Sequence, residues 1–297
     1  MQNIQTVPAK SIIYRTGNAS TLSWLDYSMN IYRGCNHGCI YCDSRSNCFR
    51  NMDFDIVKVK ENALQIIRDD LRRKVKLGVV HTGAMSDPYN PLEAELKLTR
   101  NALELINAFG FGASIATKSS LVTRDIDVLC DIKQSAPANV SFSVIAACDE
   151  LCKKIEPNVS VTSERFEALS KIAGSGIFCG VYLNPVLPFL TDTEENVLQI
   201  LRMAKDAGAK YVHTYMSMTL RPGSREYYFA QLDNYFPGIR EKYVRRYGMR
   251  KYNQSPNEKK LWGVFAAECE RLGLLYDMNA IVFANRIGYD DRQLTLF

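Results

Sequence analysis

The chain lacks the features that mark membrane-spanning, secreted or strongly charged proteins. Its 297 residues contain no apolar run approaching the ~20 residues of a membrane-spanning helix. Met1–Lys10 is polar and lacks the apolar centre of a secretory signal. Neither sign of charge is in large excess, because the 37 Lys and Arg nearly balance the 32 Asp and Glu. The net charge of +5 permits an anionic substrate without requiring one. We therefore expect a cytoplasmic protein with no membrane partner.

Histidine is also rare, whereas cysteine is not. The chain has 3 His and 9 Cys. An odd number of cysteines without an export signal predicts free thiols in a reducing compartment rather than a disulfide framework. The sequence has no repeat, low-complexity linker, zinc finger, helix-turn-helix or RNA-binding signature.

Apolar segments typical of strands alternate with segments typical of helices. The expected strands lie near 29–32, 78–81, 112–117, 139–145, 177–183 and 210–215. The expected helices lie near 61–75, 93–109, from about 125, near 163–173, and from a capping-box pattern at Thr191–Glu194 to Gly208. Strands separated by single helices predict an α/β fold with a parallel sheet, either open or closed into a barrel.

The pattern changes after Leu220 to aromatic, basic and helical sequence, with helices expected near 236–248 and 257–273. We therefore predict a core of residues 1–220 and a C-terminal extension of residues 221–297 that packs on it.

Three cysteines, Cys35, Cys39 and Cys42, have C-x3-C-x2-C spacing. Random placement would produce this spacing only about 0.008 times in a chain of this composition. Soft sulfur ligands favour an iron–sulfur cluster or zinc. Three thiolates suit a cubic cluster that keeps one iron free for a small molecule. His37 allows a Cys3His zinc site instead, but no second C-x2-C pair accompanies it.

Polar residues follow the other expected strands. The second strand runs into residues 82–93, the third ends in residues 117–120, the fourth contains Ser141 and Ser143, and the fifth runs into Asn184-Pro185. Active sites of parallel α/β folds lie at the carboxyl ends of the strands, so we expect these residues to lie near the cysteine loop.

The cysteine motif, with Tyr41 just before the last cysteine, resembles the signature of the radical S-adenosylmethionine (SAM) superfamily. Further segments resemble its spore photoproduct lyase-like branch, often labelled DNA repair photolyase-like: residues 86–93, 117–119, 124–127 and 155–157. The resemblance spans roughly residues 10–297. It implies a partial (β/α)6 barrel and a [4Fe-4S] cluster. It also implies a lyase-like enzyme that cleaves SAM reductively to a 5′-deoxyadenosyl radical.

The resemblance also implies roles for single residues. The three cysteines would ligate the cluster, Ser86 would help to bind the SAM ammonium, and Lys118 would bind the SAM carboxylate. Ser143 would reach the ribose or the carboxylate, and Tyr41 would flank the adenine. The alternatives are that Lys118 is a surface cation closing a strand and that Ser143 only satisfies a neighbouring backbone group.

One position departs from this branch. A cysteine that donates the final hydrogen atom in true spore photoproduct lyases is replaced here by Ala84. The chain therefore uses another donor, for which Cys48 and a tyrosine such as Tyr89 are candidates, or acts on a different substrate. A nucleic-acid base or DNA lesion is the expected substrate. The alternatives are a radical SAM enzyme acting on a peptide or small molecule, and a zinc-stabilised binding module.

The last five residues resemble the bacterial sliding-clamp-binding pentapeptide. Gln293 would fix the register by hydrogen bonds, and Leu294, Leu296 and Phe297 would fill apolar pockets of the clamp. The alternative is a terminal segment that packs on its own domain. The radical chemistry also implies a low-potential electron donor, flavodoxin or ferredoxin.

Cations and aromatic residues are interleaved through residues 221–252. Such a mixture grips a nucleic-acid backbone and stacks on bases. The alternative is a helix near 236–247 whose aromatic side packs on the core while its basic side faces water.

Overall fold

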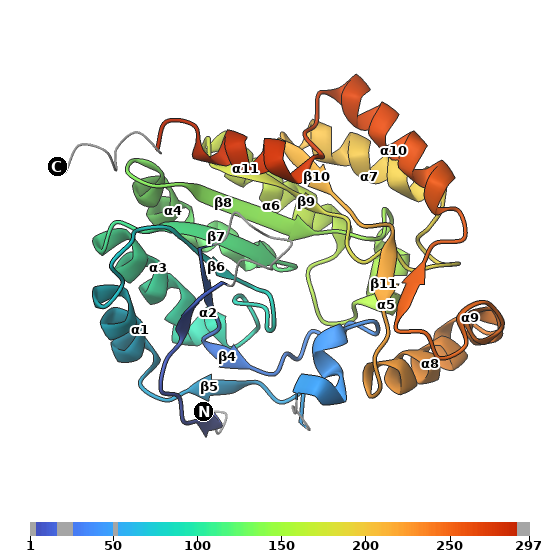
Figure 1. Ribbon diagram of the computed structural model, residues 1–297, viewed down its shortest axis with the longest axis horizontal. Coiled ribbons are helices and arrows are strands. Elements are labelled where there is room, and N and C mark those ends of the chain that lie inside the picture. The colour runs from blue at the N-terminus through green and yellow to red at the C-terminus, as the bar shows by residue number, and fades with distance from the viewer. Residues whose placement is uncertain (1–3, 17–25, 50–52, 290–297) are drawn as a thin grey trace.

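A computed structural model describes residues 4–16, 26–49 and 53–289. Its main sheet has the strand order β10-β9-β8-β7-β6-β3-β2 (Figure 1). The strands are β2 (Ile13–Arg15), β3 (Tyr27–Met29), β6 (Val79–Thr82), β7 (Gly112–Thr117), β8 (Ala138–Ser143), β9 (Phe178–Tyr182) and β10 (Tyr211–His213). All neighbours from β3 to β10 pair in parallel, and β2 pairs antiparallel with β3. The six parallel strands described follow one another along the sheet, which confirms the predicted α/β fold.

Helices cover the outer face of this sheet (Figure 1). They are α1 (Ala63–Arg72), α2 (Glu93–Leu96), α3 (Leu98–Ala108), α4 (Ile126–Lys133), α6 (Thr162–Gly174) and α7 (Glu194–Asp206). Strand β8 shows how the two faces differ. Val140 and Phe142 point into the apolar layer shared with the helices, whereas Ser141 bonds the hydroxyl of Tyr211 at 2.6 Å on the other face. The inner face of the sheet is therefore polar and buried.

Smaller elements surround the ends of the parallel strands. A three-stranded sheet contains β1 (Thr6–Val7), β5 (Lys58–Lys60) and β4 (Tyr32–Arg33), and a two-stranded sheet contains β11 (Ser217–Thr219) and β12 (Tyr252–Gln254). Short 3-10 helices are η1 (Asp43–Arg45), η2 (Asn47–Phe49) and η3 (Ser120–Asp125). The remaining helices are α5 (Asp149–Ile155), α8 (Ser224–Tyr235), α9 (Ile239–Tyr247), α10 (Glu258–Leu272) and α11 (Met278–Arg286).

The structure corrects some expected elements. The helix expected at 93–109 is divided at Lys97, whose φ of 50° is left-handed. The helix expected from Thr191 begins at Glu194, with Thr193 as N-cap, because the Thr191 hydroxyl accepts the Leu187 amide at 2.8 Å instead. Helices α5, α8 and α11 were not expected. In the described part of the chain, no helix has the length and apolarity needed to cross a bilayer. The boundary predicted at residue 220 stays a prediction.

Candidate functional site

The loop with the three cysteines begins directly after β4, in a conformation that its glycines permit. Gly34 has φ +82°, and a Cβ there would lie 2.3 Å from the carbonyl oxygen of Ile56. The Cys35 amide donates to the Phe54 carbonyl at 2.8 Å. Because a side chain at position 34 would displace this backbone, the glycine allows the loop to lie against residues 54–56.

A second segment, residues 155–158, holds the other side of the loop. The Ile40 amide donates to the Ile155 carbonyl at 3.0 Å, and the Asn158 amide donates to the His37 carbonyl at 3.1 Å. A Cβ on Gly38 would lie 2.9 Å from Cγ of Pro157. The segment recognised in the sequence as Ile155-Glu156-Pro157, with Asn158, therefore fixes the backbone on both sides of the second cysteine, Cys39.

The three thiols share one largely buried environment. Cys35 and Cys39 are buried, and Cys42 is partly exposed. Burial raises the pKa of Cys35 to about 11, with a further contribution from the Asp87 carboxylate and from Cys42. Burial raises the pKa of Cys39 well above its usual value, with Lys118 opposing the shift and Cys42 and Cys35 adding to it. These mutual effects show that the thiols lie close enough to interact.

The donor set fits a cluster better than a single metal ion. Within the described ranges, no three His, Cys, Asp or Glu side chains are arranged to hold one ion. Soft sulfur ligands suit an iron–sulfur cluster. His37, the fourth ligand of the zinc alternative, places Nδ1 3.6 Å from Oδ2 of Asp87. The chemistry of three thiols in one loop, with His37 directed at Asp87, fits an iron–sulfur cluster better than a Cys3His zinc site.

The loop after β6 connects the cysteine loop to the end of β7. Ser86 donates its hydroxyl to the Gly34 carbonyl at 2.5 Å. Asp87 accepts the Thr117 hydroxyl at 2.7 Å and the Lys118 amide at 2.8 Å. Because Asp87 also faces His37, its carboxylate fixes three segments that are distant in sequence. Ser86 is thus used by the loop backbone in this structure, and its role toward an ammonium stays a prediction.

A cluster of charged groups lies behind the second and third cysteines. Glu156 accepts the hydroxyl of Tyr41 and forms an ion pair with Arg165 at 2.6 Å. Both members of the pair are buried, with side chains 1% and 0% exposed. The ammonium of Lys118 lies 5.9 Å from the centre of the Tyr41 ring. Lys118 therefore faces the cysteine loop.

The charges in this cluster offset the effect of burial on one another. Burial alone would lower the pKa of Lys118, but the electrostatic effects of Cys39 and Glu156 outweigh it, and the net shift is upward. Burial alone would raise the pKa of Glu156, but Arg165 and Lys118 outweigh it, and the net shift is downward. Lys118 thus stays a cation and Glu156 an anion at neutral pH. A retained cation at this position suits a carboxylate ligand.

The remaining predicted residues have different surroundings. Ser143 ends β8, and its carbonyl accepts Nη1 of Arg165 at 2.7 Å. Cys48 lies in η2 and is exposed, with Sγ 3.0 Å from the Ser46 hydroxyl. Tyr89 is buried and donates its hydroxyl to Asp125 at 3.0 Å. Tyr89 therefore has a partner within the fold, which indicates a structural role.

Three residues of the site were not singled out in the sequence as functional. Asp87 and Glu156 both lie inside segments that carry the family resemblance, which was a usable signal. Arg165 lies in α6 and reaches Glu156 only because α5 ends and the chain turns back. No spacing rule connects the two residues.

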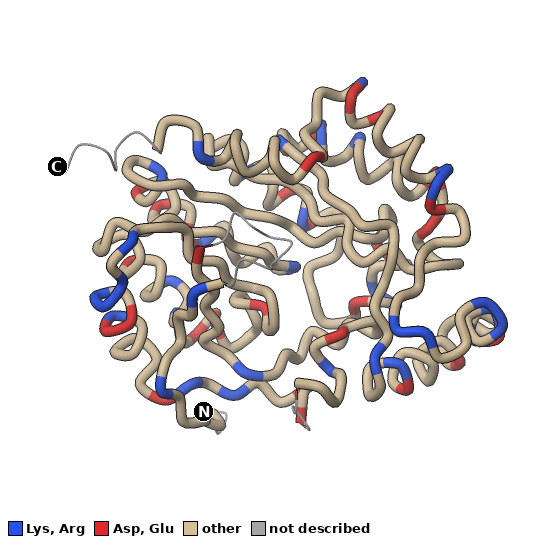
Figure 2. The backbone as a smooth tube through the Cα atoms, viewed as in Figure 1, with Lys and Arg blue, Asp and Glu red and all other residues tan. Residues whose placement is uncertain are grey.

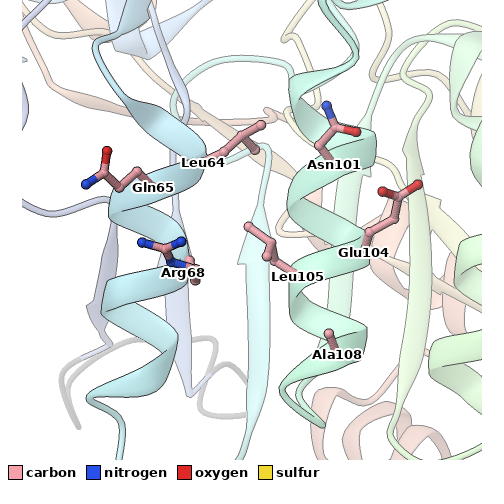
Figure 3. A pocket seen from close by; sticks show the side chains of 7 residues that line it. All are labelled: Leu64, Gln65, Arg68, Asn101, Glu104, Leu105 and Ala108. Atoms are coloured by element: carbon pink, nitrogen blue, oxygen red, sulfur yellow. The ribbon is translucent and has the colours of Figure 1, made fainter.

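A groove elsewhere on the surface has a different character. It lies between α1 and α3, outside the sheet, and Figure 3 shows its lining side chains. They are Leu64, Gln65, Arg68, Asn101, Glu104, Leu105 and Ala108. Since the groove contains none of the predicted site residues, we assign the chemistry to the cysteine loop instead.

Comparison with known proteins decides the family. The model of the Radical SAM superfamily matches residues 29–201, which include the cysteine loop and the strands from β6 to β9. The chain belongs to the radical SAM superfamily. Membership supports an enzyme and implies SAM and a [4Fe-4S] cluster, whose expected ligands are Cys35, Cys39 and Cys42.

Relatives of this radical SAM protein occur in bacteria and archaea. It is 32% identical over 248 residues to Rv2578c of Mycobacterium tuberculosis, a match that covers 81% of this chain and 72% of the relative. It is 33% identical over 180 residues to MJ0683 of Methanocaldococcus jannaschii, covering 60% of this chain and 66% of the relative.

Solved structures share the fold at low sequence identity. Spore photoproduct lyase complexed with dinucleoside spore photoproduct superposes with a TM-score of 0.66 and 18% identity, over 88% of this chain and 78% of that one. The methyltransferase TsrM of Kitasatospora setae, with tryptophan and a SAM analogue bound, superposes with a TM-score of 0.53 and 13% identity. This match covers 82% of this chain and 51% of TsrM. These likenesses confirm the radical SAM fold predicted from the sequence.

Proposed function

We propose that this protein is a radical SAM enzyme that acts on a nucleic-acid base or a DNA lesion. The observation that carries the proposal is the interacting trio of thiols with Lys118 facing their loop. The solved spore photoproduct lyase with its dinucleoside lesion supports the substrate class through the shared fold. The bound cluster would supply the electron that splits SAM into methionine and a 5′-deoxyadenosyl radical.

The chain's own residues would prepare that chemistry. Cys35, Cys39 and Cys42 would ligate the cluster through their sulfurs, and SAM would bind beside it. Lys118 would bind the SAM carboxylate through a charge-assisted hydrogen bond. Ser143 lies at the end of the next strand, within the same polar face. Tyr41, whose hydroxyl is fixed by Glu156, would flank the adenine of SAM.

The first test is metal binding. Alanine at Cys39 should abolish the brown colour of anaerobically reconstituted protein, because a buried cluster ligand is lost. Alanine at Cys130, a partly buried cysteine in α4, is the matched control and should keep the colour. Full iron and sulfide content in the Cys39→Ala variant would contradict the ligand assignment.

The second test is turnover. Reconstituted protein, SAM and a strong reductant should yield 5′-deoxyadenosine, and damaged DNA should increase its rate of formation. A low-potential flavodoxin or ferredoxin should replace the chemical reductant. If damaged DNA has no effect but a small molecule or peptide stimulates the reaction, the alternative substrate class is correct. The tryptophan-bound TsrM shows that this fold also serves such substrates.

The hydrogen donor is a separate part of the proposal. We retain Cys48 as the donor that replaces the cysteine missing at Ala84, because its thiol is exposed while the Tyr89 hydroxyl is engaged by Asp125. Serine at Cys48 should leave SAM cleavage intact and divert the substrate radical to side products. Clean product from Cys48→Ser would exclude this donor.

The C-terminal segment Gln293, Leu294, Leu296 and Phe297 lies outside the described residues. We propose, from its sequence alone, that it binds a bacterial sliding clamp. A peptide of residues 287–297 should bind the clamp in a polarisation assay, and the Phe297→Ala peptide should not. Absence of binding by the first peptide would exclude the clamp as a partner.

A further inference from the structure

A cationic surface lies on α9 and the segment that follows it. Figure 2 shows Lys and Arg gathered on α9 at the edge of the molecule. Six of these side chains are exposed, and none forms an ion pair with a carboxylate of the described residues: Lys242, Arg245, Arg246, Arg250, Lys251 and Lys259. Two nearby cations differ, since Arg240 pairs with Asp233 at 2.5 Å and Lys260 pairs with Glu194.

The opposite side of α9 explains why these cations point outward. Tyr243 and Tyr247, four residues apart, are buried, and the Tyr243 ring meets that of Phe189 edge-on at 5.4 Å. The helix is therefore fixed by its aromatic side, as the second sequence interpretation predicted. These buried tyrosines are unable to stack on bases. Lys242, Arg245 and Arg246 on the outer side have no carboxylate partner among the described residues.

The cations border an open hollow of about 520 Å³. Arg246, Arg250 and Lys259 line it, together with Tyr252. The Tyr252 ring is 64% exposed and lies 4.7 Å below the ammonium of Lys251. Glu258, which accepts the Gln254 amide at 3.3 Å, is the carboxylate in the described lining. Guanidinium groups beside an exposed aromatic ring match the phosphates and the flat bases of a nucleic acid.

The hollow is connected to the candidate active site through the β11–β12 arm. Strand β12, which contains Tyr252, pairs with β11, and β11 follows Tyr215 at the carboxyl end of β10. At the other end of this arm, Arg221 pairs with Asp43, the residue after the third cysteine, and the Asn47 amide donates to the Pro222 carbonyl at 3.0 Å. The cationic surface is thus anchored to the cysteine loop.

We propose that the hollow of Arg246, Arg250, Tyr252 and Lys259 binds the sugar–phosphate backbone of a nucleic-acid strand and presents its bases to the carboxyl ends of the barrel strands. The inference deepens the proposed function and rests on it for the substrate class. Each phosphate contact contributes about 0.7 to the slope of log K against log salt for single strands and about 0.9 for duplexes. Removing two cations should therefore lower the slope by about 1.4 or about 1.8.

The experiment measures binding and SAM cleavage on the same samples. Reconstituted holoenzyme with SAM and no reductant is titrated with fluorescein-labelled DNA at several salt concentrations. The DNA is a 15-nucleotide single strand or a 15-base-pair duplex. The double variant Arg246→Ser/Arg250→Ser should bind at least tenfold more weakly at low salt, with the smaller slope. The matched control Arg240→Ser/Lys260→Ser loses the same charge from paired side chains and should bind as the parent does. Tyr252→Ala should weaken single-stranded binding more than duplex binding.

The outcomes separate this inference from the proposed function. Equal binding by the double variant and its control overturns the surface, even if SAM cleavage responds to DNA. If the parent protein binds neither single-stranded nor duplex DNA, both the proposed binding surface and the proposed substrate class are overturned. Polyglutamate of equal length competing as well as DNA overturns the nucleic-acid assignment in favour of an acidic protein. DNA binding that follows the prediction without any 5′-deoxyadenosine after reduction supports the surface and contradicts the radical chemistry.

Discussion

Removing the guanidinium of Arg165 should be among the most destabilising single changes in this protein. The side chain is fully buried and forms an ion pair with Glu156 at 2.6 Å. It also donates Nε to the Ser160 carbonyl and Nη1 to the Ser143 carbonyl, both at 2.7 Å. In Arg165→Met the Glu156 carboxylate would remain buried with Lys118 as its remaining cation, and two carbonyls would lose their donors.

The magnitude follows from the asymmetry between breaking and replacing a buried pair. Removing one partner of a buried pair costs about 3–5 kcal/mol, because the other charge stays buried without its hydrogen-bonded counterion. Replacing both partners removes that charge, so the double variant Glu156→Leu/Arg165→Met should lose less stability than the two single changes together. We expect a coupling energy of about 2–3 kcal/mol from this cycle. The residual loss reflects the carbonyls of Ser143 and Ser160, at about 1 kcal/mol each.

Urea unfolding of the anaerobic apoprotein measures these values as shifts in midpoint at constant m-value. The matched control is Lys171→Met, because Lys171 pairs with Glu167 at 2.7 Å while both side chains are more than half exposed. That change should cost less than about 1 kcal/mol. Equal destabilisation by Arg165→Met and Lys171→Met would refute the reasoning.

The same variants give a pH signature. Although burial opposes it, Arg165 and Lys118 lower the pKa of Glu156, so the pair's stability is present above the unfolded pKa and is lost as pH falls. In Arg165→Met the pKa of the Glu156 carboxyl should rise, and its protonation should remove the buried unpaired charge. The destabilisation should therefore shrink as pH falls from neutral toward 5. A difference that stays constant with pH would contradict the role assigned to the charge.

Three further predictions concern other parts of the site and its frame. Burial lowers the pKa of His81 to about 4, so its neutral form stabilises the fold above pH 6.5. About 3 kcal/mol of stability should be lost between pH 6.5 and 4, a slope that His81→Gln should remove from urea midpoints. Gly83→Ala should cost about 2 kcal/mol or more, because φ is +105° and the Cβ would lie 1.9 Å from the Ala116 carbonyl oxygen. As the control, Gly263→Ala in α10, with nothing within 4 Å of its Cβ, should be neutral or stabilising in the same urea unfolding experiment. Lys118→Met should weaken SAM binding to iron-replete holoenzyme roughly ten- to hundredfold in equilibrium dialysis, and an unchanged Kd would exclude the carboxylate contact.

The sequence was most informative where one periodicity extends over a whole element. Strands β7 to β9 were located within about two residues, because short apolar runs such as Gly112–Thr117 alternate with longer helical segments. The break at Lys97 was not predictable, because an isolated left-handed residue leaves no mark in the apolar pattern. The thiol trio was readable because its spacing is local, and the family resemblance added Lys118.

Contacts between distant segments explain what the sequence did not show. The carboxylate of Asp87 meets Thr117 only after β6 and β7 pair, and Glu156 meets Arg165 only after α6 turns back. Both carboxylates lie inside segments recognised in the sequence. The sequence alone does not distinguish an Asp that only forms a turn from an Asp, such as Asp87, whose carboxylate joins three loops. The partners of such residues depend on the register of the sheet.

The described sheet ends at β2 on one side and at β10 on the other, and these two strands do not pair with each other. The outer edge of β10 is bridged by Leu275 instead. A ring of strands sealed all the way round would admit only what can pass through its end. The described strands form an open arc instead, so no hydrogen bonds between β2 and β10 close the side of this barrel.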